Sequence, residues 1–190
     1  MKSKAVFLDR DGVINEKRND HVKSINEFKI FSGVGNAIKL LRNKGYLVII
    51  ITNQSIISRK IISEKKLDEI HTELKNYLKQ YNTYVDSIYY CPHVPEENCN
   101  CRKPKPGLLI KATNDFDIDL EKSYFIGDTE SDLNAAKEAR CKGILLKMIK
   151  HFCKLFKINL VKLQCLGICI NEYFLNNNQQ FVSIHHQDLQ

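Results

Sequence analysis

The sequence lacks any long apolar run. No stretch of its 190 residues approaches the roughly 18 unbroken apolar residues that a membrane-spanning helix needs. Near the N-terminus the apolar run is AVFL, residues 5–8, and charged residues follow it directly. That run is too short for the apolar core of a signal peptide. We therefore expect a protein without a membrane partner that works in the cytoplasm.

The sequence also lacks clustered basic residues, although its formal net charge is +7. It has no arginine-rich run and no alternation of basic with aromatic residues, which are patterns typical of nucleic-acid binding. The positive charge therefore indicates a surface around a site for small anionic substrates. We expect no nucleic-acid partner.

Seven cysteines do not predict disulfides in a cytoplasmic protein. Three of them, Cys91, Cys99 and Cys101, lie close to His93 in the sequence. Such a cluster of thiols and an imidazole indicates a bound metal ion. The other four cysteines are scattered, and we expect buried thiols there.

Short apolar runs alternate with helical patterns, which predicts an α/β fold with a parallel sheet. We expect a single domain over residues 1–148 to account for this pattern. Residues 149–190, which contain one glycine and no proline, are expected to be a divergent extension of unknown role. Strands are expected near residues 5–8, 47–51, 85–90, 123–126 and 144–148. Helices are expected after Gly33, after a cap at Ser63, and over residues 108–116 and 132–140.

Carboxylates follow the first predicted strand in FLDRDG, residues 7–12. Asp9 and Asp11 are two residues apart, so in an extended chain they point to the same side. Ligands of open parallel sheets bind outside the carboxyl ends of the strands, which is where this pair lies. A polar loop after a strand would explain the pair equally well on its own.

Three further polar motifs follow later in the chain. The sequence ITNQS, residues 51–55, gathers hydroxyl and amide groups at a turn suited to an anion: Thr52, Asn53, Gln54 and Ser55. CRKPKPG, residues 101–107, carries the cations Arg102 and Lys103, which can bind phosphate. FIGDTESD, residues 125–132, places Asp128 as a ligand for a hard cation, while Asp132 suits a helix N-terminus.

The order of these motifs over residues 4–147 resembles the haloacid dehalogenase superfamily of phosphotransferases. The resemblance implies a Rossmann-like three-layer sandwich around a central parallel sheet, without a large cap domain. It also implies that Asp9 is the nucleophile and that Asp11 is the general acid and base. Mg²⁺ would be held by the Asp9 carboxylate, the Asp11 backbone carbonyl and Asp128. The substrate's phosphate would be bound by Thr52, Asn53, Gln54, Ser55, Arg102 and Lys103.

The stretches FLDRDGVIN, TNQS and CPHVPEENCNCRKPKPG resemble the D-glycero-D-manno-heptose 1,7-bisphosphate 7-phosphatases and the related histidinol-phosphatases. Both groups carry a structural Zn²⁺. Here the implied ligands form C-x-H-x₅-C-x-C: Cys91, His93, Cys99 and Cys101. The ion would fix the zinc loop, residues 91–101, and thereby the two cations that follow it.

The glycine after the second proline of RKPKPG favours the heptose group, so the predicted substrate is a small phosphorylated sugar, the heptose bisphosphate. Histidinol phosphate stays open as an alternative. More distant alternatives are a non-catalytic phosphosugar-binding module and a nucleic-acid 3′-phosphatase. Residues 15–24 depart from the heptose pattern with extra cations at Lys17, Arg18 and Lys23, and Thr129 replaces a lysine found in some heptose enzymes. We expect a monomer.

Overall fold

A computed structural model describes residues 2–146 of the chain. Five strands form one sheet in the order β3-β2-β1-β4-β5, and every neighbouring pair is parallel. The strands are β1 (Ala5–Leu8), β2 (Leu47–Asn53), β3 (Ser87–Cys91), β4 (Tyr124–Gly127) and β5 (Lys142–Leu145). The predicted parallel α/β fold is confirmed. The extension predicted for residues 149–190 lies outside the described residues.

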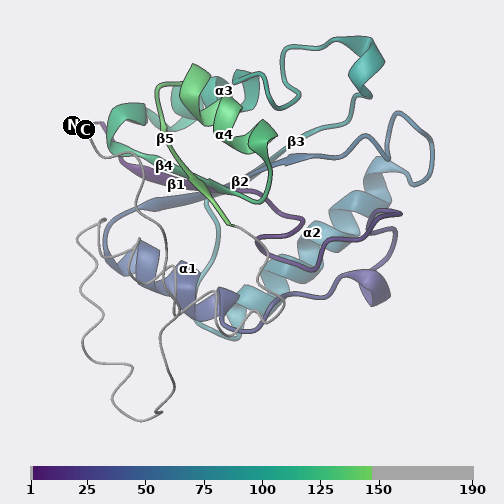
Figure 1. Cartoon of the computed structure of the whole chain (residues 1–190). Coiled ribbons are helices and arrows are strands. Elements are labelled where there is room, and N and C mark those ends of the chain that lie inside the picture. Colours follow the sequence, from purple (N-terminus) through teal and green to yellow (C-terminus); the bar gives the residue numbers. More distant parts are fainter. Residues whose placement is uncertain (1, 147–190) are drawn as a thin grey trace, which may run out of the picture.

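Helices cover both faces of the sheet (Figure 1). α1 (Val34–Asn43) and α2 (Glu64–Lys79) pack on one face, and α3 (Gly107–Phe116) and α4 (Glu130–Glu138) pack on the other. Single 3₁₀ turns occupy Ile25–Glu27, Pro95–Glu97 and Leu120–Lys122. Residues 2–146 thus form the expected three-layer sandwich, and no second domain interrupts them. None of the helices in this range is long and apolar enough to cross a bilayer.

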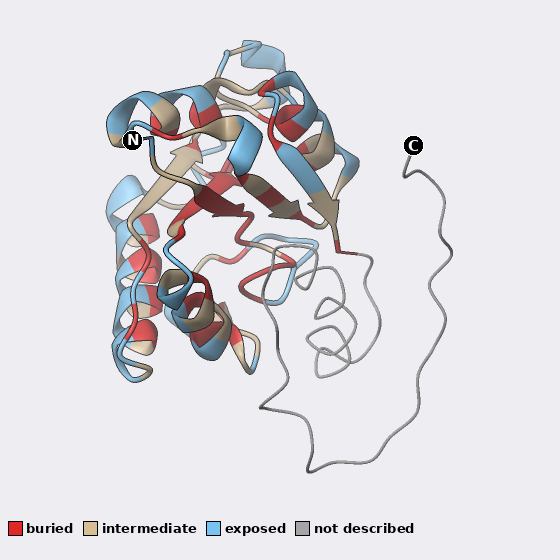
Figure 2. Ribbon diagram, turned by 90° about the vertical axis from the view of Figure 1, so that its left-hand side faces the viewer, coloured by how far each residue is buried: buried red, intermediate tan, exposed pale blue. Residues whose placement is uncertain are grey.

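The central strand β1 is buried on both faces, which explains its unbroken apolar sequence. Val6 and Leu8 pack toward α1 and α2, whereas Ala5 and Phe7 pack toward α3 and α4. Figure 2 shows the same pattern as buried residues along the sheet and on the inner sides of the helices. This double burial fixes β1 in the middle of the molecule, with its carboxyl end at the site.

Several element boundaries differ from the prediction. α4 begins at Glu130 rather than at residue 132, because Thr129 is the N-cap and Asp132 closes a capping box with it. β2 continues through Asn53, since pairing with β3 extends past the apolar run. β5 begins at Lys142, where it pairs with Tyr124 of β4, two residues before the predicted start. These shifts leave the order of the elements unchanged.

Candidate active site

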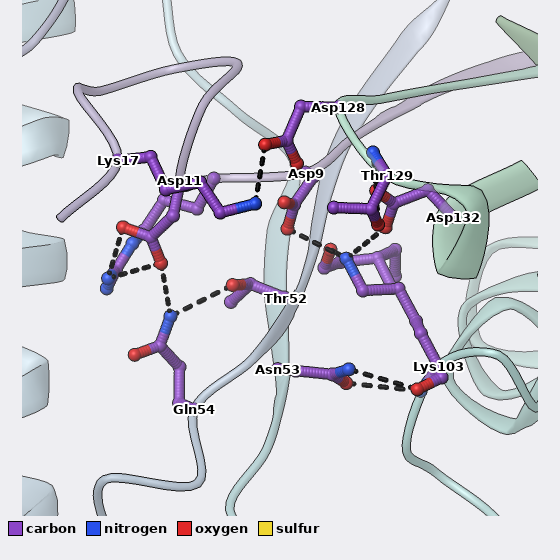
Figure 3. Close-up of polar contacts among 12 residues, drawn as sticks. Asp9, Asp11, Lys17, Thr52, Asn53, Gln54, Lys103, Asp128, Thr129 and Asp132 are labelled. Atoms are coloured by element: carbon purple, nitrogen blue, oxygen red, sulfur yellow. Dashed lines mark hydrogen bonds and ion pairs between the residues drawn. The ribbon is translucent and has the colours of Figure 1, made fainter. Parts of the chain in front are cut away.

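The carboxyl ends of β1 and β4 bring three carboxylates together. Asp9 follows β1, Asp128 follows β4, and Asp132 lies in the first turn of α4. One carboxylate oxygen from each lies within 4.8 Å of the others. The structure thus brings Asp9 and Asp128 together, and Figure 3 shows both carboxylates in the site. Asp132 is an addition, because its sequence position indicated only a helix N-terminus.

Lys103 forms ion pairs with two of these carboxylates. Its Nζ lies 2.8 Å from Asp9 Oδ1 and 2.6 Å from Asp132 Oδ1, and it also donates to the carbonyl of Ile51 at 3.0 Å. Burial opposes a charged amine, but the two carboxylates outweigh it and raise the pKa of Lys103. The side chain is therefore a buried ammonium beside the predicted nucleophile.

Asp9 carries a perturbed carboxyl group. Burial is the largest influence and raises its pKa to about 6, with further upward contributions from Asp132 and Asp11, against the lowering effect of Lys103. Lys103 is shared between Asp9 and Asp132, so its charge does not fully offset the effect of burial on the pKa of Asp9. An additional cation at this position would favour the ionised nucleophile.

The residues around Asp128 fit a divalent cation. Its Oδ1 is buried and has no hydrogen-bond partner among the described residues, while its Oδ2 contacts Lys17. Carboxylate oxygens of this kind are ligands that Mg²⁺ prefers. Gly12, at φ +94°, lies against the same carboxylate, and a Cβ there would come within 2.5 Å of Asp128 Oδ2. The donor set and the close glycine therefore agree with the predicted Mg²⁺ site.

Asp11 lies in a separate hydrogen-bonding environment. Its carboxylate accepts two bonds from Arg10 Nη2, at 2.9 and 2.8 Å, one from Asn15 Nδ2 at 2.9 Å and one from Gln54 Nε2 at 2.8 Å. Burial raises the pKa of Asp11, but the Arg10 charge and these bonds outweigh it, so the net pKa is lowered. Asp11 and Asp9 are thus perturbed in opposite directions.

Arg10 is completely buried and connects Asp11 to helix α2. Its Nη1 lies 3.4 Å from Nε2 of His71, and the guanidinium stands 5.6 Å from the centre of the Phe28 ring. Burial, followed by the Arg10 charge, lowers the pKa of His71 to about 3. The imidazole is therefore neutral and can accept a hydrogen bond from Arg10. Sequence reasoning missed both residues, although the arginine between two motif aspartates was a visible signal.

The motif after β2 holds other site residues in place. Asn53 makes two bonds of 3.1 Å to the backbone of Lys103, donating from Nδ2 to the carbonyl and accepting from the N–H at Oδ1. Gln54 Nε2 donates to Thr52 Oγ1 at 2.9 Å as well as to Asp11. Thr52, Gln54 and Ser55 are buried. Asn53 and Gln54 thus position the lysine and the predicted acid, a role that sequence reasoning did not foresee.

The zinc loop gathers its four predicted ligands. One atom from each of Cys91, His93, Cys99 and Cys101 lies within 4.8 Å of the others, and the sulfur atoms are 3.3–3.5 Å apart. Three thiols and one imidazole form a donor set that suits tetrahedral Zn²⁺. Arg102 Nη1 donates to the carbonyl of His93 at 3.0 Å. This contact ties Arg102 to the zinc loop.

Comparison with known proteins agrees with this site. A family model described as Polynucleotide kinase 3 phosphatase matches residues 4–153. A D-glycero-beta-D-manno-heptose-1,7-bisphosphate 7-phosphatase of Haemophilus ducreyi is 43% identical over 77% of this chain and 84% of its own length. The chain belongs to the heptose-1,7-bisphosphate 7-phosphatase family. A Campylobacter jejuni member, named for the alpha anomer, is 42% identical over 77% of this chain and 83% of its own length.

A solved structure of this family supports the same assignment. The D,D-heptose 1,7-bisphosphate phosphatase of B. bronchiseptica, crystallised with magnesium and phosphate, is 37% identical to this heptose phosphatase-family chain. It superposes with a TM-score of 0.72 over 75% of this chain and 79% of its own. The predicted haloacid dehalogenase-like fold and the phosphoric monoester hydrolase class are both confirmed.

Proposed function

We propose that this enzyme removes the 7-phosphate of D-glycero-D-manno-heptose 1,7-bisphosphate through a phospho-aspartate on Asp9. The observation that carries the proposal is the buried pair of Asp9 and Lys103, 2.8 Å apart, beside the carboxylate of Asp128. The names of the family members supply the sugar. A non-catalytic binding module is disfavoured, because the nucleophile, the cation and the acid are all present.

In the first step an oxygen of Asp9 bonds to phosphorus, and the bond between phosphorus and the C7 oxygen of the sugar breaks. Lys103 contacts Oδ1 of Asp9, which leaves Oδ2 to attack. Asp11 supplies the proton to the departing sugar oxygen. The pKa of Asp11 is lowered in the free enzyme, and the negative charge of an incoming phosphate would raise it toward the protonated form.

In the second step a water oxygen bonds to phosphorus and the bond to Asp9 breaks, which releases inorganic phosphate. Asp11 now takes the proton from the water. Bound to the Asp9 and Asp128 carboxylates and the Asp11 carbonyl, Mg²⁺ would screen the repulsion between the nucleophile and the phosphate. Lys103 is the residue placed to balance the charge on Asp9 throughout.

The remaining predicted residues fill supporting roles in this proposal. Thr52 and Asn53 would hold phosphoryl oxygens, with Gln54 and Ser55 completing the turn. Zn²⁺ on the zinc loop would be structural, because four protein ligands leave no position for substrate. Through Arg102 and Lys103, which follow the loop directly, the ion would keep the cations near the nucleophile. A cytoplasmic location and a monomeric state stay predictions from the sequence.

The test is a phosphate-release assay over a panel of substrates. Both anomers of the heptose bisphosphate belong in it, because family members are named for either one. Histidinol phosphate and a 3′-phosphorylated oligonucleotide represent the sequence alternative and the matching family model. We expect the heptose bisphosphate to give the highest kcat/KM, dependent on Mg²⁺ and abolished in Asp9→Asn. Faster turnover of either other substrate would overturn the sugar assignment, and activity in Asp9→Asn would overturn the nucleophile.

A further inference from the structure

The basic loop, residues 15–24, directs one of its three cations into the active site. Arg18 lies 3.0 Å from Asp20, and Lys23 pairs with Asp20 and lies near Glu27. These two cations are therefore neutralised within the loop and the adjoining 3₁₀ turn. Lys17 instead extends to the catalytic centre, where its Nζ lies 2.7 Å from Asp128 Oδ2 (Figure 3).

The base of this loop is fixed to the catalytic residues. Asn15 is fully buried, and its Nδ2 donates both to Asp11 Oδ1 and to the carbonyl of Glu16, each at 2.9 Å. The N–H of Glu16 donates to the carbonyl of Lys29 at 2.9 Å. Lys17 follows directly, so its backbone has a defined position relative to the predicted acid. The loop therefore brings Lys17 to the edge of the active site.

The Lys17 ammonium lies where the buried site meets solvent. The side chain of Lys17 is 45% exposed, whereas that of Asp128 is 4% exposed. The other cations bonded to the catalytic carboxylates are buried: Lys103 contacts Asp9 and Asp132, and Arg10 contacts Asp11. Among the described residues, Lys17 is therefore the cation that is both open to solvent and in contact with the carboxylates of the site.

Metal binding would free this ammonium for a second partner. A divalent cation on Asp128 would compete with Lys17 for the same carboxylate and repel its charge. The neighbouring Thr129 offers no replacement charge, and its hydroxyl already donates to Asp132 Oδ2 at 2.7 Å. The second phosphate of a bisphosphate bound at Asp9 needs a cation that is open to solvent and close to the centre, and the half-exposed Lys17 meets both conditions.

We infer that Lys17 binds the phosphate that stays on the sugar, and so selects a bisphosphate over a monophosphate. This inference rests on the proposed function. In the free enzyme the Lys17 ammonium is paired with Asp128 at the mouth of the site. In the loaded enzyme the flexible lysine stem lets it turn outward to the second phosphate, which is a point-charge contact of the kind lysine makes well.

The experiment compares steady-state kinetics of wild type and Lys17→Met on heptose 1,7-bisphosphate and on heptose 7-phosphate. Loss of one charged hydrogen bond to substrate should raise KM for the bisphosphate roughly tenfold. The KM for the monophosphate should rise much less than that for the bisphosphate, and Lys17→Arg should restore most of the affinity for the bisphosphate. Lys23→Met is the matched control, because it removes the same charge from the same loop without touching the site.

Calorimetric titration with Mg²⁺ alone gives a readout that does not depend on turnover. Lys17→Met should bind Mg²⁺ at least as tightly as wild type, because a competitor for Asp128 is gone. Weaker Mg²⁺ binding, equal KM increases for both substrates, no KM increase, or the same increase in Lys23→Met would each overturn the inference. Wild type without activity on the bisphosphate would refute the proposed function itself, and that result needs no variant to be seen.

Discussion

Acid should weaken this fold through one buried histidine, His71 on α2. Its side chain is 5% exposed, and burial together with the Arg10 charge lowers its pKa from 6.5 to about 3. The unfolded chain takes up this proton below about pH 6.5, but the folded chain does not until the pH approaches 3. The stability contributed by the neutral ring is therefore complete above pH 6.5 and is lost as the pH falls toward 3.

At pH 5, about 1.5 units below the ordinary histidine pKa, the ring is protonated in the unfolded chain but not in the folded one. This difference lowers the free energy of unfolding by about 2 kcal/mol. For a chain of this size that free energy corresponds to roughly 4–8 °C in the melting temperature. The matched variant is His71→Gln, which keeps an acceptor for Arg10 and does not titrate.

The assay is thermal or urea unfolding at pH 7.5 and pH 5, under reducing conditions, on wild type and His71→Gln with equal zinc content. Only the change between the two pH values counts, so any packing cost of glutamine cancels. Other titrating groups, Asp9 among them, are common to both proteins. Wild type should lose about 2 kcal/mol more than the variant. Equal losses would show that His71 is not held neutral by burial, and the reasoning would fail.

Three further results are expected. Lys103→Met leaves two buried carboxylates without their cation, so it should abolish phosphate release and destabilise the fold by about 3–5 kcal/mol in urea unfolding; retained activity would contradict its role. Gly12→Ala places a Cβ 2.5 Å from the metal-site carboxylate and should weaken Mg²⁺ binding in calorimetry, whereas Gly45→Ala, also at positive φ but with open space around it, should not. Cys99→Ser should lower the zinc content of purified protein, and Cys141→Ser, outside the four-residue cluster, should leave it unchanged.

The sequence was sufficient for elements whose local signal and tertiary environment agree. β1 is buried on both faces, so its apolar run marks the strand without ambiguity. Ser63 caps α2 as predicted, with its side chain accepting from the N–H of Lys66. The edge strands β3 and β5 are only partly buried, so their limits depend on pairing with β2 and β4 rather than on apolar pattern. Those limits were predicted less well.

The site divides in the same way. The proximity of Asp9, Asp128 and Lys103 could be predicted, because each lies in a recognisable motif at a strand end or in a loop. Arg10 and His71 could not, because their contact depends on which face α2 turns toward the β1 loop. Periodicity alone places His71 among core positions, where the common explanation is packing. The position of Arg10 between two motif aspartates was a visible signal, but its partner on α2 could be identified only from the structure.

The distribution of cations explains why the pKa values of two nearby aspartates, Asp9 and Asp11, shift in opposite directions. Asp9 shares its lysine with Asp132, so burial prevails and its pKa rises to about 6. Arg10 Nη2 donates to both carboxylate oxygens of Asp11, and two amide groups donate to it as well, so the pKa of Asp11 falls despite burial. An added divalent cation would act mainly on Asp9, where positive charge is short. In the proposed mechanism, a bound metal ion would further favour the ionised form of Asp9, whereas the substrate's negative charge would favour the protonated form of Asp11.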